Sequence, residues 1–232
     1  YGNHDRITGD KNKSIEEDNA VFIIIENIKN LYKWIEKYTG VLKASNFEIF
    51  RETLEENSMG GQAEEFLMAS GKLQVLCYKA DIEAALRTPG FAGFEILQLH
   101  DFPGQGTALV GVLDPFWEEK GYISPEAFRK FCNTTVPLVR MDKMVYLNNE
   151  TLTAKAEVAH FGEMPLLSFT PEWKVTNASE VTIKTGRLDA SSVPLGNGTP
   201  LGTISFPLKD IQTPQMLTLT LSTGEYSNSW DF

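Results

Sequence analysis

Hydrophobic side chains recur at helical spacing in the first half of the chain and at alternating spacing in the second half. From Ser14 to Tyr38 the apolar positions follow the i, i+3, i+4 pattern of an amphipathic helix, which a Ser-x-x-Glu capping box starts. The segment Val21–Ile25 alone also fits a short strand, although the helical pattern is the stronger of the two. A second helix is predicted from Ser45, whose capping-box partner is Glu48.

Two further helices follow from breaker and capping residues. A long helix is predicted between the break at Met59–Gly61 and the stop at Thr88–Gly90, because a proline disfavours helical geometry in the residue before it. Another helix begins at Pro125, with Ser124 as its cap. The buried stripe of the long helix is expected to consist of Phe66, Ser70, Leu73, Cys77, Ala80 and Ala84.

Between these helices, the segment Phe94–Leu99 has apolar side chains on both faces of a predicted strand. That pattern is typical of a parallel strand covered by helices on either side. The strand ends at the polar pair His100-Asp101, and a turn rich in glycine and proline follows. The first part of the chain therefore predicts an α/β fold with polar groups at a strand end.

After Arg140 the apolar period becomes two. Alternation is clear in Thr151–Val158, Val181–Lys184 and Leu217–Leu221. Turn signals separate these runs at residues 161–162, 177–179, 195–200 and 213–214. Short strands at this spacing predict an antiparallel immunoglobulin-like β-sandwich. The predicted fold class is thus α/β followed by all-β.

Charge narrows the classes of partner. The 232 residues carry a formal net charge of -10, with 42% hydrophobic residues. Nucleic-acid binding needs clustered Lys and Arg, and an anionic membrane surface would repel this chain. We therefore expect no nucleic acid and no membrane as partners. An uncharged partner, such as a sugar or another protein, fits without electrostatic cost.

Cysteine and histidine give no metal or redox motif. Cys77 and Cys132 are too few for a disulfide framework or a zinc site, and a buried thiol is the expected role of each. His4, His100 and His160 have no acidic neighbours at metal-ligand spacing, so no metal site and no cofactor are predicted.

Three segments of the chain carry a resemblance to a known family. Residues 35–56, 69–114 and 120–140 resemble the closing portion of a family 2 glycoside hydrolase, and the most specific matches are LRTPGFAGF (86–94) and DFPGQGTALVG (101–111). The β-galactosidase-like enzymes of gut bacteria are the nearest group. The resemblance runs from about residue 35 to the end, whereas residues 1–34 show none and are of unclear origin. The chain would be the end of an enzyme that is periplasmic or secreted; no signal peptide is recognisable here, so the compartment stays open.

The resemblance implies a fold and a division into domains. Residues 35–142 would be the C-terminal part of a (β/α)8 barrel, and residues 143–232 the immunoglobulin-like sandwich. In such a barrel the active site lies at the carboxyl ends of the strands. Gly93–Leu99 would then be the last barrel strand. Its missing neighbours would leave an apolar edge, so self-association is a further expectation, unless the helix at 14–38 shields that edge.

The family's chemistry is retaining exo-glycoside hydrolysis. It requires two glutamates whose carboxyls stand roughly 5 Å apart. Neither of the family's two glutamate motifs is present in this chain, and Glu26 lacks the Gly-Gln that should follow the nucleophile. No catalytic residue is therefore assigned, and the chain is expected to be inactive alone. The alternative is a non-catalytic carbohydrate-binding or structural interaction module.

The resemblance implies that the parent enzyme binds a carbohydrate, either a galactoside or a plant oligosaccharide, and three residues are candidates for contact with it. The resemblance places His100 and Asp101 at the pocket end of the last barrel strand, where their alternative role is to cap the strand. Trp117 lies close to the barrel end in the sequence, and an exposed ring could stack on the apolar face of a pyranose. Trp173 and Trp230 are weaker candidates for the same role, because aromatic residues are more often buried, and Glu95 is a weaker candidate for polar contact.

Overall fold

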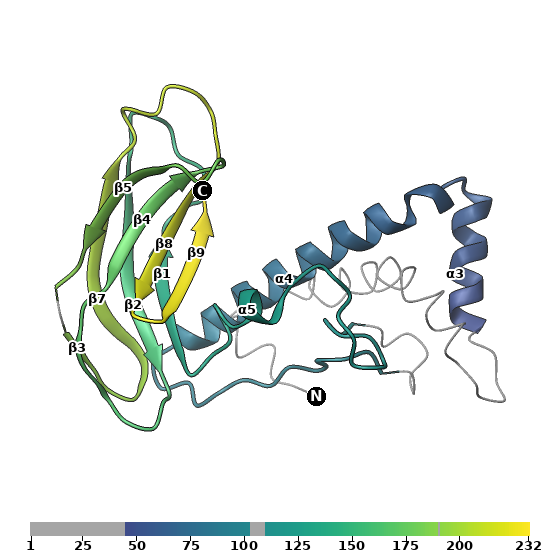
Figure 1. Cartoon of the computed structure of the whole chain (residues 1–232), viewed down its shortest axis with the longest axis horizontal. Helices are drawn as coiled ribbons and strands as arrows, with labels where there is room; N and C mark the ends of the chain where they lie inside the picture. Colours follow the sequence, from purple (N-terminus) through teal and green to yellow (C-terminus); the bar gives the residue numbers. More distant parts are fainter. Residues whose placement is uncertain (1–44, 103–109, 190) are drawn as a thin grey trace. The chain divides into compact units, whose positions relative to one another are not determined.

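The computed structural model describes residues 45–102, 110–189 and 191–232 (Figure 1). Internal contacts divide the chain into two compact units. The described part of the first, here called the helical unit, comprises residues 45–81, 94–102 and 110–125. The second, the sandwich unit, comprises Ile82–Gly93 and the described residues from Glu126 to Phe232. The helix expected over Ser14–Tyr38 lies outside the described residues.

The helical unit contains helix α3 (Ser45–Glu56), the 3-10 turn η1 (Gly60–Gln62) and most of helix α4 (Ala63–Leu86). Helix α3 begins at the predicted cap Ser45, and η1 replaces the predicted break. Helix α4 ends two residues before Thr88, where the Thr-Pro-Gly signal placed the stop. Breaker residues therefore predicted the helix limits well, because their backbone preferences are local.

The predicted stripe of α4 is wrong in part. Leu73, Cys77 and Ala80 are exposed, and the expectation that Cys77 is a buried thiol fails with them. The buried side of the helix runs instead through Leu67 and Gly71. The cause is close packing: a Cβ at position 71 would lie 2.3 Å from the ring of Tyr122, so the helix turns its glycine toward that ring.

The strand predicted over Phe94–Leu99 is not formed. The segment has no regular secondary structure, and the described bridge next to it joins His100 to Leu113 in parallel orientation. Leu97 is 75% exposed rather than covered by helices. A parallel strand needs neighbours on both edges to satisfy its backbone groups. Among the described residues only Leu113 supplies such a pairing, so the barrel is not shown.

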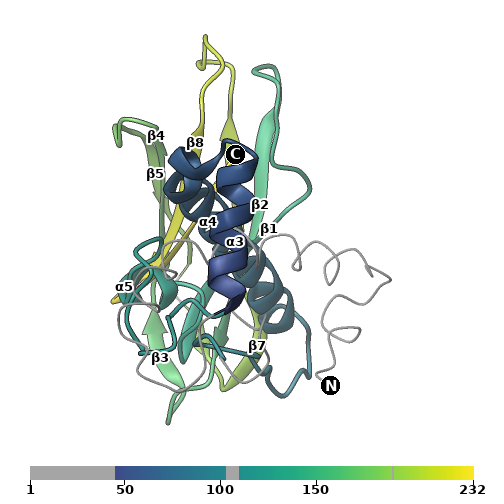
Figure 2. The ribbon, with the colours of Figure 1, turned by 90° about the vertical axis from the view of Figure 1, so that its right-hand side faces the viewer.

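The sandwich unit consists of antiparallel sheets (Figures 1 and 2). One has the order β1-β2-β7 and another β5-β4-β8-β9, and the two-stranded ribbon β3-β6 completes the unit. The short helix α5 (Pro125–Phe128) precedes β1. The strands are β1 (Thr135–Met141), β2 (Thr151–His160), β3 (Leu166–Phe169), β4 (Glu172–Asn177), β5 (Thr182–Arg187), β6 (Ser191–Val193), β7 (Gly196–Pro207), β8 (Leu217–Thr223) and β9 (Tyr226–Asp231).

A β-rich C-terminal part is therefore confirmed. Strand β8 alternates between buried and half-buried residues, as its period-two pattern predicts. The turn expected at residues 195–200 is wrong, since β7 begins at Gly196. Gly196 and Gly198 have φ values of 122° and 74°, and the register between β2 and β7 shifts beside them, so turn-type residues are accommodated as bulges within a strand.

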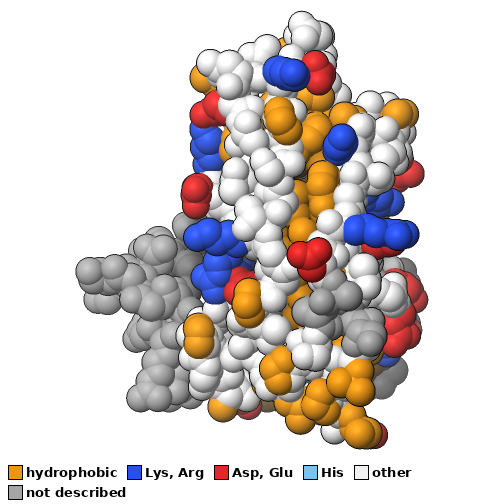
Figure 3. Space-filling view, turned by 90° about the vertical axis from the view of Figure 1, so that its left-hand side faces the viewer, with side chains coloured by type: hydrophobic (Ala, Val, Ile, Leu, Met, Phe, Trp, Pro, Cys, Tyr) orange, Lys and Arg blue, Asp and Glu red, His pale blue; other side chains and the backbone are white. Residues whose placement is uncertain are grey.

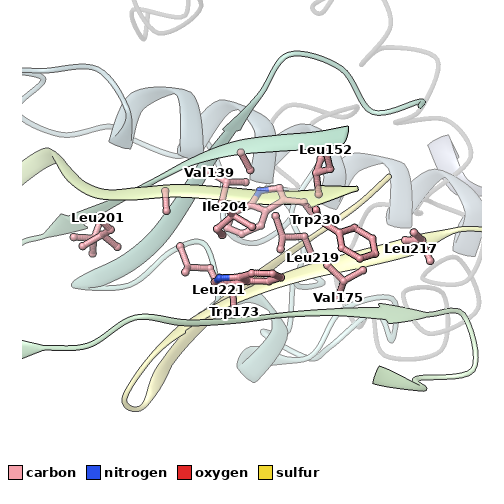
Figure 4. Close-up of a cluster of buried hydrophobic side chains, with 14 of the residues drawn as sticks. Val139, Leu152, Trp173, Val175, Leu201, Ile204, Leu217, Leu219, Leu221 and Trp230 are labelled. Atoms are coloured by element: carbon pink, nitrogen blue, oxygen red, sulfur yellow. The ribbon is translucent and has the colours of Figure 1, made fainter. Parts of the chain in front are cut away.

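The core of the sandwich unit lies between its three-stranded and four-stranded sheets (Figure 4). Leu152 and Ile204 contribute to it from one sheet, and Leu219 and Leu221 from the other. Trp173 and Trp230 also belong to this core, with exposures of 9% and 7%. Their rings are therefore packing elements in this structure, as the general preference of aromatic residues indicated.

Candidate functional site

A tight turn at Asp114–Glu118 organises the candidate site in the helical unit. The buried Asp114 carboxylate accepts hydrogen bonds through Oδ1 from the backbone N–H of Phe116 at 2.8 Å and of Glu118 at 2.9 Å. The backbone closes the same turn, because Trp117 N–H donates to the Asp114 carbonyl at 3.0 Å. Asp favours such turns since its short carboxylate reaches N–H groups a few residues on.

The turn holds Trp117 in an unusual backbone conformation. Its φ is 65°, a left-handed value that is rare for a bulky side chain and costs on the order of 1–3 kcal/mol. The side chain is 61% exposed, so burial of the indole does not offset that cost. Its ring stacks on His100, with centroids 4.3 Å apart and planes inclined by 21°. The structure thus brings together two of the three residues predicted to contact a sugar.

The third predicted residue, Asp101, faces the interior. It is fully buried, its Oδ1 lies 2.8 Å from Lys120 Nζ, and it accepts the Gly111 N–H at 2.9 Å. Burial raises the pKa of this carboxyl, while the Lys120 cation and the Gly111 N–H act in the opposite direction. Asp101 is therefore placed to fix the backbone next to His100, and its direct contact with a sugar stays a prediction.

Helix α4 supports the same segment from within the helical unit. The Tyr122 hydroxyl lies 2.9 Å from Gln74 Oε1 and 3.1 Å from the Gly111 carbonyl oxygen. The Gln74 amide in turn donates to the carbonyl of Val110. A Cβ at Gly111 would lie 2.3 Å from the backbone of His100, so only glycine permits this approach. These contacts fix the backbone beneath the His100–Trp117 pair.

Sequence reasoning missed two of the residues that build the site. Asp114 follows an apolar run and precedes Pro115, and the Asp-Pro pair is a turn signal that could have located it. Lys120 gave no such signal, because its partner Asp101 lies 19 positions away in the sequence. Glu95, the weaker candidate, is exposed and lies on the irregular segment before His100.

The described part of the chain has neither a candidate metal site nor a candidate membrane-spanning helix. In that part of the chain, no group of three His, Cys, Asp or Glu side chains could hold a metal ion. Of the helices described, none is both long and apolar enough to cross a membrane. The arrangement combines an exposed indole, an adjoining imidazole and a buried ion pair.

Similarity to known proteins is partial. Residues 150–232, less than half of the chain, match a family model described as "Domain of unknown function (DUF8488)". No curated protein matches the sequence.

Glycoside hydrolases are among the solved structures that resemble parts of this chain. A β-glucuronidase of Parabacteroides merdae is 14% identical over 43% of this chain and 14% of its own, with a TM-score of 0.31. An exo-chitosanase of Amycolatopsis orientalis is 10% identical over 73% of this chain and 19% of its own, with a TM-score of 0.43. The Bacillus subtilis sporulation control protein Spo0M is 15% identical over 44% and 48%, with a TM-score of 0.29. The chain thus spans less than a fifth of either enzyme.

Proposed function

We propose that this chain is a non-catalytic part of a β-galactosidase-like glycoside hydrolase, and that its His100–Trp117 surface contacts sugar. The sequence resemblance supports the enzyme class. The single observation that carries the contact surface is the exposed Trp117 ring, held at a φ of 65° by the Asp114 turn. Strained backbone that the surrounding structure maintains tends to mark functional positions.

The two rings suit an uncharged, hydroxylated ligand. The face of Trp117 away from His100 can stack on the apolar face of a pyranose, which excludes water from both surfaces. The imidazole of His100 can donate to or accept from a hydroxyl beside that ring. Asp101 acts through the backbone in this proposal: its ion pair with Lys120 keeps His100 beneath the indole.

Hydrolysis requires a pair of catalytic carboxyl groups in addition to the His100–Trp117 surface. A retaining mechanism needs one carboxyl as acid and base and a second as nucleophile, roughly 5 Å apart. Asp101 and Asp114, the buried acids of the helical unit, are both engaged in internal hydrogen bonds. The proposal therefore has the two glutamates supplied outside this chain, in the missing part of a barrel whose end would be residues 35–142.

The sandwich unit has a supporting role in this proposal. We assign it to the immunoglobulin-like class because β1, β2 and β7 pair in one sheet while β4, β5, β8 and β9 pair in the other. Such sandwiches carry many unrelated functions, so this fold assignment alone says nothing about activity.

Calorimetric titration of the full chain with methyl β-D-galactoside and with a galacto-oligosaccharide tests the contact surface. We expect weak binding that becomes about tenfold weaker in Trp117→Ala, because loss of a stacked ring costs about 1 kcal/mol or slightly more. Phe116→Ala is the matched control, since it removes a neighbouring exposed ring and should leave affinity unchanged.

Two results would contradict the proposal. Affinity that is the same in Trp117→Ala and the unaltered chain would exclude the indole as a sugar contact. Release of nitrophenol from p-nitrophenyl β-galactoside by the purified chain would mean that a complete carboxylate pair exists within it.

A further inference from the structure

The sandwich unit has a pocket of about 590 Å³ that adjoins the interior core, because its lining includes the core residues Leu208 and Leu217. The loop between β1 and β2, the loop between β7 and β8, and Phe232 form its walls. This volume lies in the range of about 300–1,000 Å³ that is usual for small-molecule sites. The pocket belongs to neither the His100–Trp117 surface nor any role derived above.

The β1–β2 loop that forms one wall is held by Glu150. The Glu150 carboxylate accepts hydrogen bonds from Lys143 Nζ and from the Leu147 N–H, each at 2.6 Å. These two bonds lower the pKa of the Glu150 carboxyl, so it is ionised at neutral pH. The Glu150 N–H also donates to the Leu147 carbonyl, and the Glu150 carbonyl accepts from the Leu208 N–H. The second bond joins the β1–β2 loop to the wall that follows β7. The pocket is thus shaped before any ligand arrives.

The lining favours aromatic ligands. The Tyr146 and Phe232 rings meet edge to face, with centroids 5.9 Å apart and planes at 86°. Met144 and Met216 border the pocket and are each 52% exposed. Thioethers pack well against aromatic rings and adapt to irregular shapes. Holding such side chains in water is unfavourable, so a planar apolar group that covers them would gain hydrophobic free energy.

The distribution of charged side chains favours an uncharged ligand. Lys, Arg, Asp and Glu side chains are spread over the broad face of the sandwich unit that Figure 3 shows. In contrast, no charged side chain is among the described residues that line the pocket. The nearby Lys143 is neutralised by Glu150, and burial raises the pKa of the Tyr146 phenol, which stays protonated. The amides of Asn148 and Gln215 remain as polar groups for hydrogen bonding.

We propose that this pocket binds an uncharged aromatic small molecule that carries one or two hydrogen-bonding groups. The two aromatic rings and two methionines would cover its planar part. The amides at the rim would bind its polar substituents and set its orientation. Because the pocket lies wholly within the sandwich unit, this site is independent of the proposed sugar contact.

Fluorescence titration of the full chain with 1-N-phenylnaphthylamine, a neutral aromatic amine, tests the site. We expect saturable binding of one molecule per chain.

Met216→Glu places a charge at an exposed position of the lining and should weaken binding about tenfold or more, which corresponds to about 1.4 kcal/mol. Met164→Glu is the matched control, because Met164 is 74% exposed and does not line the pocket. The sulfonated analogue 8-anilinonaphthalene-1-sulfonate should bind about tenfold less tightly than the neutral probe.

Three outcomes would overturn the proposal. Equal weakening by Met216→Glu and Met164→Glu would place the probe elsewhere, and tighter binding of the sulfonate would contradict a neutral ligand. Absence of probe binding, combined with self-association in sedimentation that Met216→Glu abolishes, would identify the pocket as a contact between protein chains instead.

Discussion

The buried carboxylate of Glu83 joins the end of α4 to the last strand of the sandwich unit. It is 3% exposed, and its Oε2 accepts from Trp230 Nε1 at 2.9 Å and from Arg87 at 3.0 Å. Its Oε1 accepts from the Asn228 amide at 2.8 Å. Asn228 also donates to the carbonyl of Pro137 in β1, so one side chain links three elements. A buried charge is tolerated only when it is paired in this way.

Glu83→Gln should lower the free energy of unfolding of the sandwich unit by about 2–4 kcal/mol. The new amide would direct N–H groups at a site where Trp230 and Asn228 already donate, and it would leave the Arg87 guanidinium without its carboxylate. Urea unfolding followed by circular dichroism measures the change. Glu65→Gln, on the exposed side of the same helix, should change stability by less than about 0.5 kcal/mol. A loss no larger than this control's would show that the network contributes little.

Sequence predicts the surroundings of a candidate residue only where neighbouring positions determine them. The sequence makes His100 a candidate because a polar pair follows an apolar run, and Trp117 a candidate because it is close to that segment. Asp101 is a candidate for the same reason as His100, but the sequence does not predict the direction of its side chain. That direction depends on Lys120, which reaches it only through the folded backbone. Long-range ion pairs of this kind leave no periodic signal.

The limits of helix α4 are predictable from local sequence, whereas its buried side is decided by packing. Its limits follow from a glycine pair and a Thr-Pro-Gly stop, whose backbone preferences act locally. Its buried side does not follow from hydrophobicity, because the exposed Leu73 is far more apolar than the buried Gly71. The aromatic ring of Tyr122 occupies the space beside the glycine. Packing of one large ring against a residue without a side chain thus decides the orientation.

Gly71→Ala tests that packing through the sign of its effect. Alanine at a helix interior ordinarily stabilises by about 1 kcal/mol relative to glycine. Here the added Cβ would lie 2.3 Å from the Tyr122 ring, and displacing that ring should cost about 1–3 kcal/mol. We therefore expect Gly71→Ala to be destabilising in thermal unfolding. It should also disturb the Tyr122 contacts to Gln74 and Gly111.

Gly61→Ala provides the control for this substitution. No atom lies within 4 Å of a Cβ built at Gly61, and its backbone is not left-handed, so alanine there should be neutral or slightly stabilising. If both variants were equally stabilising, the ring of Tyr122 would not pack on α4 as described.

The β-rich C-terminal part of the fold prediction is confirmed and the barrel strand is not, because antiparallel and parallel strands need different pairing partners. Antiparallel strands pair with sequence neighbours, as β8 does with β9 across a short turn, so alternation within one stretch is sufficient to predict them. A parallel barrel strand pairs only with distant strands, and Phe94–Leu99 has one parallel bridge beside it in the described residues. The hydrophobic content of this segment therefore indicated burial that the described chain does not provide.

Hydrogen exchange measured by mass spectrometry tests this contrast across the chain. Amides of β8 lie between β4 and β9 with Leu219 and Leu221 fully buried, so they should open only with global unfolding and exchange at least about 1,000-fold more slowly than an unstructured peptide. Amides of residues 94–98 have no described backbone hydrogen bonds and should exchange within about tenfold of the unstructured rate.

Repeating the measurement at several protein concentrations provides the control. Strong protection of residues 94–98 at every concentration would contradict the irregular segment described here, because the strand would then be paired within one chain. Protection that appears only at high concentration would instead indicate that a second copy supplies the missing neighbour, which is the self-association expected of an exposed barrel edge.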